Sequence, residues 1–205
     1  MPEKFLALPR EKQNRIIESA MTVFGAVGYK KTYISEIAAA AGISKAMIFF
    51  YFGSKKALYL YLIEYAGKIM ITEVQEREGT TNTDFFDRIV EATWLKLSVM
   101  NHYPAISGFL SSIYYENDPE VVQEIKTLLS KGEVIRLQIA LDGADESKFK
   151  NGVDPKLVLD ILVKFTEGAL GSRLDRVRPI DEIMTEFTQC LNLLKNNLYK
   201  DEFLK

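Results

Sequence analysis

The chain has 205 residues, of which 47% are hydrophobic and 26% are charged, and its formal net charge is −2. This balance is typical of a globular protein and excludes a fibrous or disordered chain. One cysteine and one histidine exclude a disulfide framework and a multi-ligand zinc site, so we expect no metal and no cofactor. With no apolar run of ~18 residues and no recognisable signal peptide, a cytoplasmic protein without membrane contact is expected.

Charge is distributed unevenly along the sequence. Residues 1–60 contain nine lysines and arginines against four acidic residues, whereas the remainder contains 17 against 24. A basic N-terminal third attached to an acidic body is typical of a protein in which one part meets a polyanion such as DNA. A solvated charged face is the simpler alternative.

The first predicted helix spans about residues 10–27. Gly28 follows it and supplies a left-handed C-terminal stop. The apolar residues spaced along one helix face are Ile16, Ile17, Ala20, Phe24 and Val27.

Residues 34–52 predict two short helices joined by a tight turn. Gly42 lets the backbone pass through positive φ, and the Ser44 hydroxyl is placed to accept a hydrogen bond from an N–H of the second helix. This pattern predicts a helix-turn-helix whose second helix enters the major groove of DNA. We expect the two helices to pack through Ile37, Ala38, Ala41, Ile43 and Ile48. The expected outward residues are Lys45, Ala46, Met47, Phe49 and Phe50.

Helical spacing continues through the rest of the chain and no alternating strand pattern occurs, so the predicted fold class is all-α. Pro104, Pro119, Pro155 and Pro179 stand where helices begin, because proline is tolerated in the first turn. Further helices are expected near residues 55–77, 83–101, 104–115, 119–141, 155–175 and 180–199.

Residues between 28 and 58 form one more extended pattern. Its parts are Gly28-Tyr29-Lys30-Lys31-Thr32, Ile37-Ala38, Ala41-Gly42-Ile43-Ser44, Ile48-Phe49-Phe50-Tyr51-Phe52 and Ser54-Lys55-Lys56-Ala57-Leu58. This pattern resembles the DNA-binding domain of the TetR family of transcriptional regulators. The resemblance implies a homodimeric, all-helical, ligand-responsive repressor. Its N-terminal three-helix DNA-binding domain would cover residues 1–55, and a helical effector-binding and dimerisation domain would cover residues 56–205.

The resemblance also implies particular contacts with the DNA backbone. Lys55 matches a phosphate contact at the start of a helix, where N–H groups and the helix dipole also favour an anion. Tyr51 matches a position that touches the backbone, although a core position is the alternative. Thr32 and Tyr33 match two positions that are usually hydroxyl residues, with tyrosine replacing the usual threonine at the second. Phe49 replaces the usual tyrosine and offers no hydroxyl to a phosphate.

Base recognition is expected from the start of the second short helix. Lys45 is placed to bind a guanine edge or, alternatively, a phosphate, and Ala46 and Met47 are placed for apolar contact with a base. The complete set of expected contacts with a double-stranded operator is Thr32, Tyr33, Ser44, Lys45, Ala46, Met47, Phe49, Phe50, Tyr51 and Lys55.

The C-terminal body contains more aromatic residues than helix packing requires, and a helical bundle can hold a pocket lined by them. Glu91 and Trp94 share a helix face, and Glu167 interrupts an apolar helix. We therefore expect an amphipathic or cationic small-molecule effector held by aromatic faces and a carboxylate. A surface position beside core aromatics is the alternative for Glu91. The expected pocket residues are Trp94, Glu91, His102, Phe109, Tyr114, Phe165 and Glu167.

The last two predicted helices have wide apolar faces, and Gly168 and Gly171 favour close helix approach. We expect these helices to form a two-fold symmetric dimer interface. The sequence thus predicts a repressor that a small molecule releases from a palindromic operator. A helical small-molecule or lipid carrier without an operator is the alternative. No enzyme is expected, because neither GxSxG nor GxxxxGK[ST] occurs.

Overall fold

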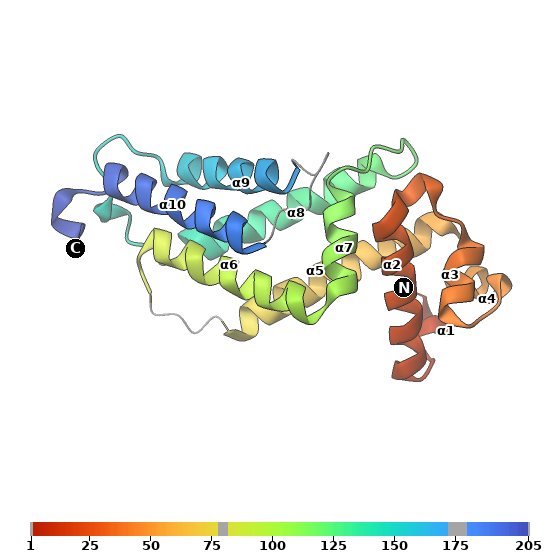
Figure 1. Ribbon diagram of the computed structural model, residues 1–205. Coiled ribbons are helices and arrows are strands. Elements are labelled where there is room, and N and C mark those ends of the chain that lie inside the picture. Colours follow the sequence, from red (N-terminus) through yellow and green to blue (C-terminus); the bar gives the residue numbers. More distant parts are fainter. Residues whose placement is uncertain (1, 78–81, 172–179, 205) are drawn as a thin grey trace. The chain divides into compact units, whose positions relative to one another are not determined.

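The computed structural model describes residues 2–77, 82–171 and 180–204, and the described residues form helices without a β-strand (Figure 1). The predicted all-α class is confirmed. The helices are α1 (Glu3–Leu6), α2 (Arg10–Lys31), α3 (Ile34–Ala41), α4 (Lys45–Phe52), α5 (Lys55–Arg77), α6 (Phe85–His102), α7 (Pro104–Ile113), α8 (Val122–Leu141), α9 (Pro155–Gly171) and α10 (Ile180–Leu198), with 3-10 turns at Glu146–Lys148 and Asp201–Phe203.

Most predicted boundaries agree with these helices to within three residues. The α2 ribbon continues past Gly28 to Lys31, but Gly28 itself has the predicted left-handed φ of 77°. Pro119 lies in a turn rather than a helix, and α8 begins three residues later at Val122. Helix α1 was not predicted, and Pro179 lies outside the described residues.

No single described helix is long and apolar enough to cross a membrane. Helices α3 and α4 are long and apolar enough for a membrane span only when taken together, and the pair is bent by 103° at its turn.

The chain divides into two compact units. The first contains residues 1–78 and 95–132, and the second contains residues 79–94 and 133–205. The first unit extends past residue 55 because Leu58, Tyr59 and Leu62 of α5 are buried in the same core as the N-terminal helices. The functional boundary expected at residue 55 stays a prediction.

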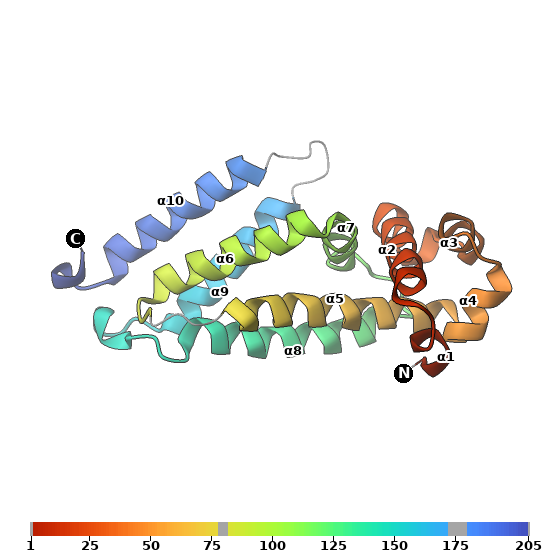
Figure 2. The ribbon, with the colours of Figure 1, turned by 90° about the horizontal axis from the view of Figure 1, so that it is seen from below.

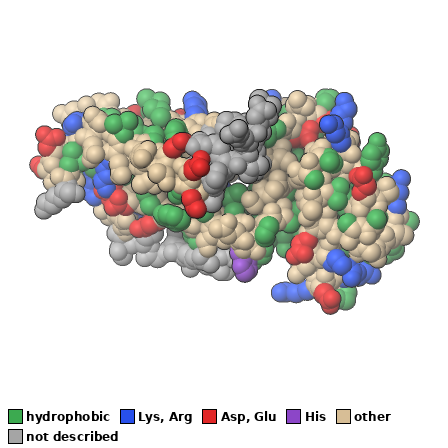
Figure 3. Space-filling model, viewed as in Figure 1, with side chains coloured by type: hydrophobic (Ala, Val, Ile, Leu, Met, Phe, Trp, Pro, Cys, Tyr) green, Lys and Arg blue, Asp and Glu red, His purple; other side chains and the backbone are tan. Residues whose placement is uncertain are grey.

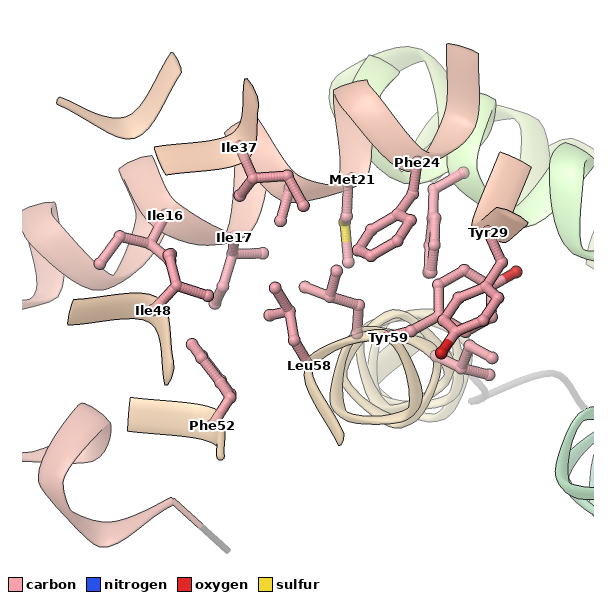
Figure 4. Close-up of a cluster of buried hydrophobic side chains, with 14 of the residues drawn as sticks. Ile16, Ile17, Met21, Phe24, Tyr29, Ile37, Ile48, Phe52, Leu58 and Tyr59 are labelled. Carbon is pink, nitrogen blue, oxygen red and sulfur yellow. The ribbon is translucent and has the colours of Figure 1, made fainter. Parts of the chain in front are cut away.

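The core of the first unit joins the N-terminal helices to α5 and α7 (Figure 4). Phe24 contacts Tyr59 and Phe109, with ring centroids 4.9 and 6.3 Å away. Helix α2 packs directly against α7 (Figures 1 and 2). A Cβ atom at Gly25 would lie 3.0 Å from the backbone of Gly108 and of Phe109, so glycine is required at this crossing.

The second unit contains an aromatic cluster beside a buried carboxylate. Phe86 packs against Phe149 and Tyr199, with centroids 6.0 and 5.1 Å away. Asp84 accepts hydrogen bonds from the N–H of Phe86 and from the ammonium groups of Lys148 and Lys195, each at 3.1 Å. These contacts join the start of α6 to the segment before α9 and to the end of α10.

We predict that Asp84→Asn destabilises the protein in a pH-dependent way. Burial raises the pKa of Asp84, but the N–H of Asp87 and the two lysines outweigh it and lower the pKa overall. The Asp84 carboxylate therefore stabilises the fold fully at pH values above the pKa of aspartate in the unfolded chain, ~3.9. This stabilisation is lost as the pH falls through the lower pKa that Asp84 has in the folded protein. Urea unfolding at pH 7 should show a loss of about 2 kcal/mol.

The same comparison near pH 2 should show a much smaller difference between wild type and variant. Asp160→Asn, at an exposed position on α9, is the matched control and should change stability little at either pH. Equal stability of wild type and Asp84→Asn at pH 7 would contradict the prediction.

Candidate nucleic-acid interface

The predicted helix-turn-helix is present in α3 and α4. Gly42 ends α3 in the left-handed region with φ of 66°, and the N–H of Ile43 donates to the Ala38 carbonyl at 3.0 Å. The Ser44 hydroxyl accepts a hydrogen bond from the N–H of Met47 at 3.3 Å and thereby caps α4. The sequence therefore predicted the turn and its cap correctly.

Helix α4 has one buried side and one exposed side. Ile48 and Phe52 face the core, whereas Phe49 and Phe50 are 39% and 55% exposed. Lys45 and Ala46 are exposed on the same side, and the Lys45 ammonium lies 5.9 Å from the Phe49 ring centroid.

Two other predicted contact residues of α4 are less accessible. Met47 is half-buried and packs against the hydrophobic core. Tyr51 is 7% exposed and contacts Phe5 and Phe50, with centroids 6.1 and 5.6 Å away. Most of the Tyr51 ring is thus buried, as expected for a core residue, which was the alternative to a contact with the DNA backbone.

Thr32 and Tyr33 stand at the start of α3 in different environments. Thr32 is 2% exposed, and its hydroxyl donates to the Gly28 carbonyl at 2.7 Å. Tyr33 is 69% exposed, and its N–H donates to the Glu36 carboxylate at 3.1 Å. The Thr32 hydroxyl therefore holds the turn after α2, whereas the Tyr33 phenol ring faces solvent.

Lys55 begins α5 beside the end of α2. Its ammonium donates to the Lys30 carbonyl at 3.3 Å and lies 4.4 Å from the Tyr29 ring centroid. The Ser54 hydroxyl accepts from the N–H of Ala57 at 3.0 Å and caps the helix. Lys55, the residue predicted to bind a phosphate, thus lies at the start of a capped helix, and none of the described carboxylates pairs with it.

The turn that supports Lys55 is held by Glu116, which sequence reasoning missed. One carboxylate oxygen of Glu116 accepts from the N–H of Tyr29 at 2.7 Å, and the other accepts from the N–H groups of Asn117 and Asp118. Burial raises the pKa of the Tyr29 phenol, as it does for Tyr59, so both stay neutral. No local pattern predicts a contact between residues 87 positions apart.

Three predicted effector residues lie in the first unit. Phe109 is completely buried and contacts Tyr59 at a centroid distance of 5.4 Å. Tyr114 is 44% exposed. His102 is exposed, with its ring edge against Tyr103. Phe109 therefore has a core role in this unit, in contrast to the two surface residues.

The other predicted effector residues lie in the second unit. Trp94 is 58% exposed, and the exposed Glu91 accepts a hydrogen bond from Asn82 at 2.9 Å. Phe165 stacks on Phe187 at 6.5 Å. The side chain of Glu167 lies outside the described residues. Glu91 thus lies at the surface, which was the alternative to its expected role in an effector pocket.

Comparison with known proteins agrees with this architecture. The family model for bacterial regulatory proteins of the tetR family matches residues 16–62. The chain is 43% identical over 133 residues to the uncharacterized HTH-type transcriptional regulator YuxN of Bacillus subtilis, covering 65% of this chain and 44% of YuxN. The aligned region spans about half the length of the curated relatives it matches.

Solved structures show the same fold along nearly the whole chain. A TetR family transcriptional regulator from Chloroflexus aurantiacus is similar with a TM-score of 0.68 and 20% identity, covering 97% of this chain and 98% of that one. The regulator FadR from Bacillus subtilis, in complex with stearoyl-CoA, has a TM-score of 0.67 and 18% identity, covering 88% and 96%.

The capped recognition helix and the all-helical fold define a protein of the helix-turn-helix DNA-binding class. Residues 16–62 match the family of tetR bacterial regulatory proteins, and the fold of the chain agrees with that of a solved TetR family regulator.

We predict that Glu116→Gln destabilises the protein and weakens any DNA contact made by Lys55. The variant keeps the size of the side chain but replaces one acceptor oxygen with an amide that cannot accept an N–H. Urea unfolding should show a loss of about 1–3 kcal/mol. Glu64→Gln on the exposed side of α5 is the matched control, and a variant as stable as wild type would contradict the prediction.

Proposed function

We propose that the protein is a homodimeric transcriptional repressor that binds a palindromic operator and is released by an amphipathic small molecule. The observation that supports it most strongly is the exposed side of the capped helix α4, which bears Lys45 in the basic part of the chain. Figure 3 shows lysine and arginine side chains over these N-terminal helices. Such a protein acts on the chromosome, so we place it in the cytoplasm.

The two lysines would serve different parts of the DNA. Lys45, at the N-terminal turn of α4, would reach a base edge, with Ala46 beside it for apolar contact. Lys55 would bind a phosphate together with the N–H groups at the start of α5. Tyr33 and Phe50 are exposed and would add further contacts with the DNA backbone.

The proposed dimer would form through α9 and α10, as the sequence predicts. Leu157 and Ile161 of α9 are 56% and 46% exposed, and Leu193 of α10 is 64% exposed. Leu157 and Ile161 stand four residues apart and therefore share one face of α9, and a contiguous exposed apolar face marks an interaction surface.

An amphipathic effector agrees with the exposed aromatic residues of the chain and with the ligand of a protein of the same fold. FadR from Bacillus subtilis is solved with stearoyl-CoA, a molecule with a long apolar chain and a charged head. We propose that Trp94 and Phe165 contribute to an effector-binding site, and that the effector lowers DNA affinity by binding the DNA-incompetent state more tightly.

We predict that Lys45→Ala and Lys55→Ala affect operator binding differently. Lys55→Ala should weaken binding to all duplexes alike and reduce the slope of log K against log[salt] by about 1. Lys45→Ala should lose about 1–3 kcal/mol of discrimination at one base pair of each half-site. Duplexes selected by the wild type from a random library, and single-base variants of them, provide the measurement. A wild type without any sequence preference would support the carrier alternative.

We predict that Trp94 reports effector binding, because it is the only tryptophan in the chain. Titration with long-chain acyl-CoA, hydrophobic cations and neutral apolar compounds should change the fluorescence saturably for at least one class. The same compound should release the selected duplex over the same concentration range. A compound that binds tightly without affecting DNA binding would contradict the regulatory role.

A further inference from the structure

Helix α1 lies outside the helix-turn-helix, yet its one aromatic side chain is completely buried. Phe5 is 0% exposed and contacts Tyr51, Phe52 and Tyr61, with ring centroids 6.1, 4.8 and 5.6 Å away. Aromatic side chains buried in this way contribute strongly to packing. Residues 3–6 are therefore part of the first unit's core and not a free N-terminal arm.

The backbone after α1 is also fixed. The amide of Gln13 on α2 donates to the carbonyls of Leu6 and Leu8 at 3.1 and 2.8 Å. Two of the three aromatic partners of Phe5 belong to α4, and α1 packs directly against α4. The position of α1 is thus set relative to the recognition helix itself.

This anchoring places the neighbouring Lys4 on the exposed side of α4. Lys4 is exposed, and its ammonium lies 4.2 Å from the centroid of the Phe50 ring. Phe50 shares the exposed side of α4 with Lys45 and Ala46. The ammonium of Lys4 is therefore held beside the surface that faces DNA in the proposed function.

The charge of Lys4 is available to a ligand. Among the residues that the structure describes, no carboxylate pairs with its ammonium, which rests on an aromatic face instead. An aromatic face attracts a cation and restricts its position but has no net charge to neutralise it. A phosphate that approaches Phe50 would meet a positioned, unneutralised ammonium group.

We propose that Lys4 is an additional phosphate contact of the DNA-binding surface, supplied by α1 and held beside the recognition helix by the burial of Phe5. The inference rests on the proposed DNA-binding function and extends its surface beyond residues 32–55. A phosphate contact adds affinity without base discrimination. Lys4 should therefore strengthen binding to all sequences alike.

The test compares wild type, Lys4→Ala, Lys4→Arg and a control, Lys126→Ala, at an exposed position on α8. Each binds a fluorescent duplex selected by the wild type, over a series of salt concentrations. Lys4→Ala should bind several-fold more weakly and reduce the slope of log K against log[salt] by about 1. Lys4→Arg and Lys126→Ala should keep the wild-type slope, and circular dichroism should show an unchanged fold for all four proteins.

The outcomes separate the two proposals. If the wild type binds the duplex and Lys4→Ala binds it with unchanged affinity and slope, the Lys4 contact is wrong and the proposed function stands. If Lys4→Ala changes base preference instead of the slope, Lys4 is not a phosphate contact. If the wild type selects no duplex at all, the proposed function is wrong and the contact is wrong with it.

Discussion

The close approach of α2 to α7 at Gly25 is the constraint on which the first unit depends. Backbone atoms of α7 occupy the space that a Cβ atom at Gly25 would need, so at this point no side chain separates the two helices. This contact places Phe109 against Phe24 and Tyr59 in one aromatic core. The helix-turn-helix is consequently not a separate small domain with a core of its own, and its position is fixed by α5 and α7.

Five lysines illustrate two kinds of partner, an aromatic ring and a carboxylate. In the first unit, Lys4, Lys45 and Lys55 lie over aromatic rings. In the second unit, Lys148 and Lys195 pair with the carboxylate of Asp84. A paired lysine stabilises the fold but contributes little positive potential, whereas a lysine over a ring keeps its charge for a polyanion. In the first unit Lys56 also pairs with a carboxylate, that of Glu124, so the distinction holds for particular lysines and not for whole units.

The sequence predicted what local rules determine. Periodicity located the helices, and the residue types at Gly42 and Ser44 identified the turn and the N-cap, because backbone conformation there depends on single residues. Contacts between distant residues could not be predicted in this way. Glu116 accepts a hydrogen bond from the N–H of Tyr29, a residue far from it in sequence. Phe5 forms no periodic pattern by itself, so neither α1 nor the position of Lys4 was foreseen. Phe109 is in the core because α2 packs on α7, a pairing that composition does not indicate.

The proposed response to an effector must be compatible with this rigid first unit. Helix α4 is held by buried residues from α1 and α3, so local melting of the recognition helix would expose Phe5 and Phe52 at high cost. A small molecule would therefore act by changing how the two first units of a dimer are presented to neighbouring major grooves, as rigid bodies. Half-sites for such a dimer would be separated by whole turns of DNA, so a change in the separation of the two first units would break simultaneous contact. The effector can change the affinity for DNA by no more than the ratio of its own affinities for the two arrangements of the dimer.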